Sequence, residues 1–224
     1  MCTVTYIPLQ NDDFILTSNR DESPLRRTLV PSTYKEDEVE LTYPKDEIAG
    51  GTWIGHSSRK RVVCLLNGGF EKHKRELSYR MSRGVIVKKI LAVEDAVVFI
   101  DQFNFTEIEP FTIVLVTWED KLKAYELVWD GQKKHFSKLK KQPSIWSSAT
   151  LYTEKHKKSR KKWFKEWLSE KHEFTEENIK KFHLDDSLGD ESFSFKMKRD
   201  NVQTVSVTSI LKKGDDIQMN YQKL

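Results

Sequence analysis

Short apolar runs broken by polar turns fill the first third of the chain and predict β-strands. The first two runs, at residues 3–6 and 14–16, are joined by the polar stretch 11–13. Two such runs with a short polar turn between them are typical of a β-hairpin. The longer runs at 61–66 and 111–118 lack polar alternation, which predicts buried strands.

Four later segments carry apolar residues at helical spacing and begin at a capping hydroxyl or at acidic residues. They predict helices at 83–92, 94–103, 153–171 and 175–183. Turn signals and apolar alternation predict further strands at 48–55, 121–129, 135–139, 144–149, 202–210 and 217–221. The stretch 24–45 contains Pro31 and Pro44 and is predicted to be mostly loop.

The composition fits one globular α+β domain over residues 1–224. Hydrophobic residues make up 38% of the chain, and aromatic residues, at 11%, help to fill a core. Because 38 basic residues face 34 acidic ones, the net charge of +4 does not by itself indicate a nucleic-acid partner. The lysine-rich helix predicted at 153–171 could bind nucleic acid or an anionic surface. The simpler interpretation is that its aromatic residues face the core and its lysines form a solvated face.

Several functional classes lack their sequence signals. No apolar stretch of about 18 residues predicts a membrane span, and no secretory signal opens the chain, so we expect a soluble cytoplasmic protein without integral membrane contact. Two cysteines do not make a disulfide scaffold. The six histidines have no metal-ligand spacing, and no phosphate-binding loop or serine nucleophile elbow occurs. We therefore expect no metal and no organic cofactor.

Cys2 is the candidate nucleophile. If Met1 is removed, Cys2 carries a thiol and a free α-amine on the same residue. The α-amine titrates at about 7.7–8.0 and a free thiol at about 8.5, so the amine can accept the thiol proton near neutral pH. The alternative is structural, because a single cysteine in a strand is often a small buried hydrophobe.

Residues 19–22 form the second candidate feature, a polar cluster at the end of the second apolar run. Asp21 could hold the α-amine of Cys2, Arg20 could favour the thiolate or bind substrate charge, and Asn19 could contact substrate. Neighbouring strands lie roughly 4.8 Å apart, so a hairpin would bring the cluster beside Cys2. The alternative interpretation is a solvated turn.

Asn67, Gly68 and Gly69 follow the buried run 61–66 and form a third feature. A side-chain amide next to free backbone N–H groups is what an oxyanion hole requires. The same residues also fit a plain Asn-Gly turn. Trp53 could face a substrate cleft or pack in the core, and composition favours the core.

These motifs resemble the NRDE family, also called the transport and Golgi organisation protein 2 family. The resemblance rests on Met1-Cys2-Thr3, the segment 18–24, the segment 50–55, the segment 65–70 and Ser82-Arg83-Gly84, in that order. It implies a relation to N-terminal-nucleophile hydrolases and a four-layer αββα sandwich of two mainly antiparallel sheets. It also favours the oxyanion role for Asn67, with Gly68 beside it.

The chain departs from the pattern of its relatives at one site position. Relatives commonly carry an asparagine at the end of a later strand, where this chain has Ser147 and Ser148. Ser148 is therefore the predicted polar contact to substrate, since a hydroxyl can also donate a hydrogen bond.

Two functions follow from the sequence. The first is hydrolysis of an amide-type C–N bond of a small molecule by Cys2, with Arg20, Asp21 and Asn67 assisting. The second is non-catalytic binding or trafficking on the same fold, which the family name suggests, with haem or another metabolite as the ligand. The sequence indicates no particular oligomeric state.

Overall fold

The computed structural model describes residues 3–170 and 173–224. Contacts within the chain divide it into two compact units. Unit 1 consists of residues 1–25 and 142–224, and unit 2 consists of residues 26–141. Each unit has its own antiparallel sheet and its own pair of helices, so the α+β class with two antiparallel sheets is confirmed. The single domain expected over residues 1–224 stays a prediction.

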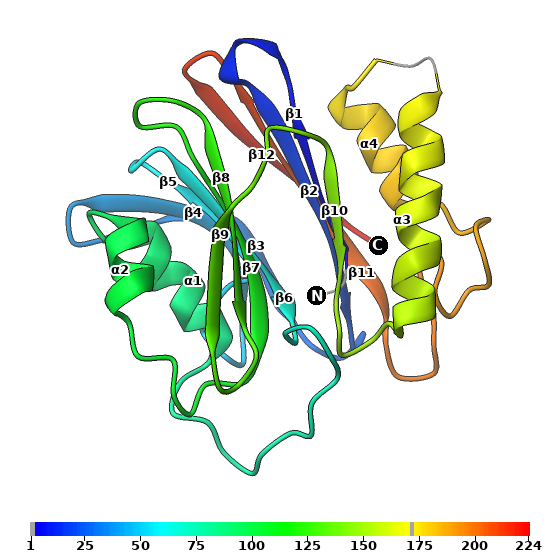
Figure 1. The fold of residues 1–224 in the computed structure, drawn as a ribbon, viewed down its shortest axis with the longest axis horizontal. Coiled ribbons are helices and arrows are strands. Elements are labelled where there is room, and N and C mark those ends of the chain that lie inside the picture. The colour runs from blue at the N-terminus through cyan, green and yellow to red at the C-terminus, as the bar shows by residue number, and fades with distance from the viewer. Residues whose placement is uncertain (1–2, 171–172) are drawn as a thin grey trace. The chain divides into compact units, whose positions relative to one another are not determined.

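The sheet of unit 1 has five strands in the order β10-β1-β2-β11-β12 (Figure 1). Their bounds are β1 (Thr3–Pro8), β2 (Phe14–Glu22), β10 (Ser144–Ser147), β11 (Gln203–Lys213) and β12 (Asp216–Lys223). The predicted hairpin is confirmed, since β1 pairs with β2 from Thr3 opposite Asn19 to Pro8 opposite Phe14. The first and last segments of the chain therefore lie in the same sheet.

Two helices cover one face of this sheet. Helix α3 (Glu154–Ser169) contacts β10, and α4 (Glu176–His183) contacts β2 and β11. Thr153 and Thr175 cap the two helices as predicted, each accepting a hydrogen bond from a backbone N–H of the first turn. The buried core between the helices and the sheet consists of Ile7, Ile15, Phe164, Ile179, Phe182 and Phe195.

The sheet of unit 2 has seven strands that follow the order of the chain, β3-β4-β5-β6-β7-β8-β9. Their bounds are β3 (Thr28–Glu36), β4 (Val39–Asp46), β5 (Ile54–Ser57), β6 (Arg61–Asn67), β7 (Phe111–Thr117), β8 (Lys123–Trp129) and β9 (Lys134–Lys138). Each strand pairs antiparallel with the next. Short connections join most neighbours, which suits antiparallel pairing, whereas the long segment 68–110 lies between β6 and β7.

The loop predicted for residues 24–45 is wrong, since this stretch forms the β3–β4 hairpin. β3 is an edge strand with mostly exposed side chains, so no apolar alternation marks it. Pro31 lies where the register shifts between Leu29 and Ser32, a position at which a missing N–H is tolerated.

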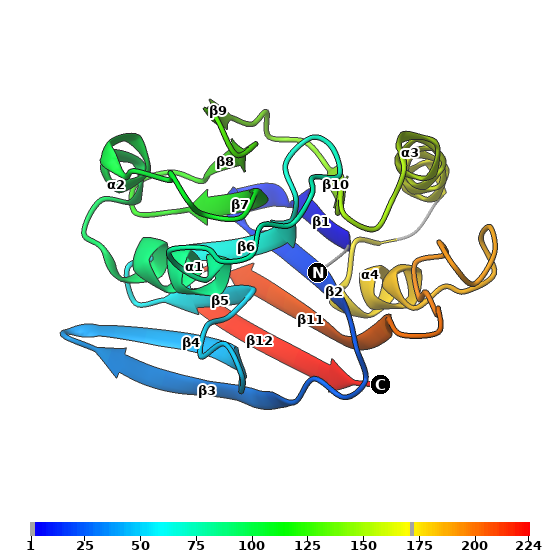
Figure 2. The ribbon, with the colours of Figure 1, turned by 90° about the horizontal axis from the view of Figure 1, so that it is seen from below.

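Helix α1 (Arg83–Ala92) packs on β4, β5 and β6, and α2 (Ala96–Gln102) contacts α1 (Figure 2). Ser82 caps α1 as predicted, and the Asp95 carboxylate caps α2. At the other end of α1, the buried Arg61 donates hydrogen bonds to the carbonyls of Ile90, Val93 and Glu94. In residues 3–170 and 173–224, every helix is too short or too polar to span a bilayer.

Candidate active site

The predicted site residues of unit 1 gather at the beginning of β1. Thr3 pairs with Asn19 on one side and with Ser147 on the other. Asn19 and the two residues after it lie on the central strand β2, whose side chains point alternately to opposite faces of the sheet. Cys2, the predicted nucleophile, lies outside the described residues.

Asp21 is a buried carboxylate whose two oxygens each accept a hydrogen bond from a hydroxyl. Tyr152 Oη donates to Oδ2 over 3.0 Å, and Thr204 Oγ1 donates to Oδ1 over 2.7 Å. Only 3% of Asp21 is exposed. Because two hydroxyls on two other segments hold the carboxylate, its orientation is fixed. Asp21 is therefore a rigid acceptor at the end of the sheet where the chain begins.

Asn19 and His183 form a second buried network on the same face. Asn19 Nδ2 donates to the carbonyls of His183 and Phe195, over 2.9 and 2.8 Å. Since carbonyls only accept, Asn19 Oδ1 is the atom that faces His183 Nδ1, over 2.5 Å. Nδ1 must then carry the proton, and Nε2 of the neutral ring accepts from Thr5 Oγ1 over 2.7 Å. Asn19 thereby ties β2 to the end of α4.

Burial, with a smaller effect of the nearby Arg160 cation, lowers the pKa of His183 from its ordinary 6.5 to about 3. The imidazole of His183 is completely buried, and its partner at each nitrogen is neutral. Neither partner therefore supplies a negative charge that would offset the desolvation cost of the protonated form. His183 is therefore neutral in the folded protein at physiological pH.

We expect this histidine to make stability depend on pH. The unfolded chain binds a proton near pH 6.5, whereas the folded chain binds it only near pH 3. Stability therefore rises with pH across this window and is lost as the pH falls through it, by up to about 1.4 kcal/mol per pH unit for one proton. Urea unfolding between pH 3 and 7 should show a flatter profile for His183→Asn, which keeps a donor toward Asn19.

The matched control for this experiment is His135→Asn. His135 is exposed in β9, where solvent screens its contact with Asp130, so its replacement should change the slope less than His183→Asn does. Parallel profiles for the wild type and His183→Asn would contradict the assignment of the slope to His183.

Arg160 of α3 is a completely buried cation next to Thr3. Its guanidinium donates to Ser147 Oγ over 3.0 Å, to the carbonyls of Phe193 and Ser194 over 2.8 and 2.7 Å, and to Thr3 Oγ1. It also lies over the Tyr152 ring, 4.1 Å from the centroid. Within the described residues no carboxylate contacts the guanidinium, so neutral acceptors and aromatic faces replace its hydration. Arg160 joins α3 to the first residues of β1.

Arg20 and Ser148 complete the predicted residues of unit 1. Arg20 is 2% exposed, and because neighbours in a strand alternate, its side chain lies on the face opposite Asn19 and Asp21. Ser148 follows β10, is 1% exposed, and shares a hydrogen bond of 2.9 Å with Thr150 Oγ1.

The remaining predicted residues, Trp53, Asn67 and Gly68, belong to unit 2. Asn67 ends β6, opposite Phe111 of β7. The Gly68 N–H donates to the carbonyl of Pro110 over 3.0 Å, and its φ of +86° favours glycine. Trp53 is 3% exposed, and its carbonyl accepts from the Leu65 N–H over 2.7 Å. The backbone donor of Gly68 is thus already used within unit 2.

A family model described as Transport and Golgi organisation 2 matches residues 1–219. The chain belongs to this family. The resemblance read from residues 1–90 is thereby confirmed and extends over almost the whole length. A search of the curated proteins gave no significant match.

Solved structures share the fold of this family member at low sequence identity. An N-acylethanolamine-hydrolyzing acid amidase ortholog from Caenorhabditis elegans has a TM-score of 0.64 and 13% identity, over 94% of this chain and 92% of that one. Penicillin V acylase from Agrobacterium tumefaciens gives 0.53 and 10%, over 100% and 86%. A variant of conjugated bile acid hydrolase from Clostridium perfringens gives 0.51 and 8%, over 99% and 92%. The fold is that of the N-terminal-nucleophile hydrolases.

The sequence interpretation of this Transport and Golgi organisation 2 family member missed His183, Arg160, Tyr152 and Thr204. A signal for Arg160 was present, since it precedes Phe164 and Trp167 by four and seven residues and so shares their face of α3. Tyr152 and Thr204 gave no comparable signal. Their contacts with Asp21 join positions 131 and 183 residues apart in the chain.

Proposed function

We propose that this protein is an N-terminal-cysteine amidohydrolase acting on a small molecule. The observation that carries the proposal is Asp21, a buried and doubly hydrogen-bonded carboxylate at the end of the sheet where Thr3 pairs with Asn19. Cys2 is joined to Thr3 by one peptide bond, about 3.8 Å between Cα atoms. An acid held rigidly in this part of the sheet suits the task of orienting an α-amine.

The reaction begins with loss of Met1, which frees the α-amine of Cys2. The amine accepts the thiol proton, and the sulfur attacks the amide carbonyl carbon to form a tetrahedral oxyanion. The oxyanion collapses as the C–N bond breaks, and the leaving nitrogen takes the proton from the amine. Water then attacks the thioester, releasing the carboxylic acid and restoring the thiol.

The residues of the proposed site have distinct roles. Asp21 holds the amine, and Arg20 favours the thiolate or binds substrate charge. The side-chain amide of Asn67 is proposed to donate to the oxyanion. The neighbouring Gly68 N–H is not assigned this role, because it donates to the Pro110 carbonyl. Asn19, Trp53, Gly68 and Ser148 are proposed to shape the substrate site.

The substrate class is proposed from the chemistry and from the fold. The three structural neighbours are named an acid amidase, an acylase and a conjugated bile acid hydrolase, and likeness to them supports an acylated small amine as substrate. The proposal needs no metal, because the carbonyl is activated by hydrogen-bond donors.

Intact mass and an acylating probe test the proposal. Intact mass of the purified protein should show loss of Met1, and 4-nitrophenyl acetate should acetylate Cys2 faster than Cys64. Cys64 is the matched control because it is a completely buried cysteine in β6. Cys2→Ala should abolish the fast release of 4-nitrophenolate. Retention of Met1, or equal release from Cys2→Ala, would instead favour non-catalytic binding or trafficking on the same fold.

A further inference from the structure

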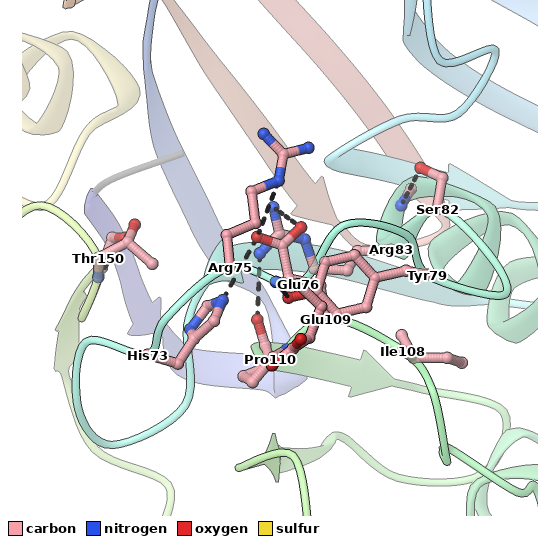
Figure 3. Close-up of polar contacts among 12 residues, drawn as sticks. His73, Arg75, Glu76, Tyr79, Ser82, Arg83, Ile108, Glu109, Pro110 and Thr150 are labelled. Carbon is pink, nitrogen blue, oxygen red and sulfur yellow. Dashed lines mark hydrogen bonds and ion pairs between the residues drawn. The ribbon is translucent and has the colours of Figure 1, made fainter.

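The backbone carbonyl of Pro110 in unit 2 accepts two hydrogen bonds, and Figure 3 shows Pro110 beside Arg83, one of the two donors. The Pro110 carbonyl accepts from the Gly68 N–H over 3.0 Å and from Arg83 Nη1 over 3.1 Å. The Gly68 N–H is part of the peptide bond that joins Asn67 to Gly68. Arg83 is thus connected to the Asn67 peptide through a single acceptor.

Gly68 is also held at its own carbonyl, which accepts from Thr112 Oγ1 over 3.1 Å. The peptides on both sides of the Gly68 Cα are therefore fixed to the segment that enters β7. A donor next to such a segment keeps its place without reorganising when charge develops on an oxyanion.

Arg83 is itself oriented by a carboxylate. Its Nη2 lies 3.0 Å from Glu109 Oε2, and the two side chains are 16% and 15% exposed. His73 Nε2 approaches the other oxygen, Oε1, to 3.4 Å. The planar guanidinium can donate to the carboxylate and to the Pro110 carbonyl at once, which a lysine ammonium does with less directional control.

The beginning of α1 fixes the backbone of Arg83. A Cβ added to Gly84 would lie 2.9 Å from both the N and the O of Thr52, and one added to Gly51 would lie 2.6 Å from the Gly84 carbonyl carbon. Only glycine at both positions allows this backbone contact. Two glycine-containing motifs noted in the sequence thus meet in one contact, directly beside Arg83.

We propose that Arg83, held by Glu109, is the positioning residue for Asn67. The assignment rests on the proposed oxyanion role of Asn67. Arg83 does not touch the reacting atoms and acts through the Pro110 carbonyl and the Gly68 peptide. A displacement of a catalytic group by about 1 Å can lower a rate by about 100-fold, so loosening this connection should slow acylation by about 10- to 100-fold.

Two reactions of Cys2 distinguish a positioning role of Arg83 from a general disturbance of the site. Acetylation by 4-nitrophenyl acetate passes through an oxyanion, whereas alkylation by iodoacetamide does not. Arg83→Gln should slow acetylation by about 10- to 100-fold and leave alkylation within about twofold of the wild type. Asn67→Ala should show the same selectivity with a larger effect, on the order of 10²–10³-fold.

Arg75→Gln is the matched control. Arg75 lies 4.0 Å from the same Glu109 carboxylate, but its side chain is 79% exposed. Its loss should change neither rate. Arg83→Lys keeps the charge next to Glu109 and replaces Arg83→Gln in the acetylation experiment if Arg83→Gln does not fold. It should retain the thermal midpoint and still acetylate slowly.

Hydrogen exchange of the Gly68 amide tests the connection between Arg83 and Gly68 without relying on a reaction of Cys2. Arg83→Gln should raise its exchange rate, and Arg75→Gln should not. Normal acetylation in both Arg83 variants, with slow acetylation in Asn67→Ala, would overturn the inference. If the wild type is not acetylated at Cys2, the hydrolase proposal fails, and unchanged Gly68 exchange in Arg83→Gln would then overturn the positioning role as well.

Discussion

Replacing Asp21 with asparagine is expected to slow acetylation of Cys2 by about 100-fold, the typical cost of displacing a catalytic group by about 1 Å. Asparagine has the shape of aspartate and can still bond to the hydroxyls of Tyr152 and Thr204, so the fold should persist. It removes the negative charge that would orient and stabilise the α-amine of Cys2 as it gains the proton. Stopped-flow release of 4-nitrophenolate, with intact mass after quenching, measures the effect.

Asp13→Asn is the control for this experiment. Asp13 lies at the other end of the β1–β2 hairpin, where it pairs with Lys212 over 3.2 Å. Its replacement should leave the rate of acetylation unchanged. A wild-type rate for Asp21→Asn would show that the carboxylate has only a structural role.

Arg160→Met should destabilise the protein by about 3–5 kcal/mol. Methionine fills much of the space, but it leaves the carbonyls of Phe193 and Ser194 without their donor, and each buried unsatisfied group costs about 1–3 kcal/mol. It also removes the contact with Thr3 Oγ1 and with two aromatic rings. Urea unfolding at neutral pH measures the change.

Lys161→Met is the matched control, because Lys161 is the next residue of α3 and its side chain is exposed. Its effect should stay within about 0.5 kcal/mol. Replacing a buried charge by an apolar group is stabilising in some proteins. If Arg160→Met were as stable as the wild type, desolvation of the guanidinium would outweigh its hydrogen bonds.

Local signals predicted most of the secondary structure. Ser82, Thr153 and Thr175 cap their helices, and the runs at 3–6 and 14–16 form the expected hairpin, because caps and short turns depend on neighbours in sequence. The β3–β4 hairpin was not predicted, because β3 is exposed at the edge of its sheet and lacks apolar alternation. The buried alternation of Val39, Leu41 and Tyr43 in β4 was the signal available.

The candidate site was predicted less completely than the secondary structure. Asn19 and Asp21 were recognised as polar residues at a strand end, and the structure places both in buried hydrogen-bond networks. Their partners come from segments far along the chain, which no local pattern connects to β2. Arg160 was overlooked because the neighbouring basic residues of its helix are mostly exposed lysines. Its spacing of four residues from Phe164 places it on the buried face.

The sequence by itself determined the helices, most strands, the family and the residue types from which a site could be built. These follow from the periodicity of apolar side chains and from short motifs, which act over a few neighbouring residues. Only the tertiary structure decided which hydroxyls hold Asp21, which tautomer His183 adopts and which carbonyl joins Arg83 to Gly68. Those contacts depend on sheet register and helix packing, which bring together groups between 27 and 183 residues apart.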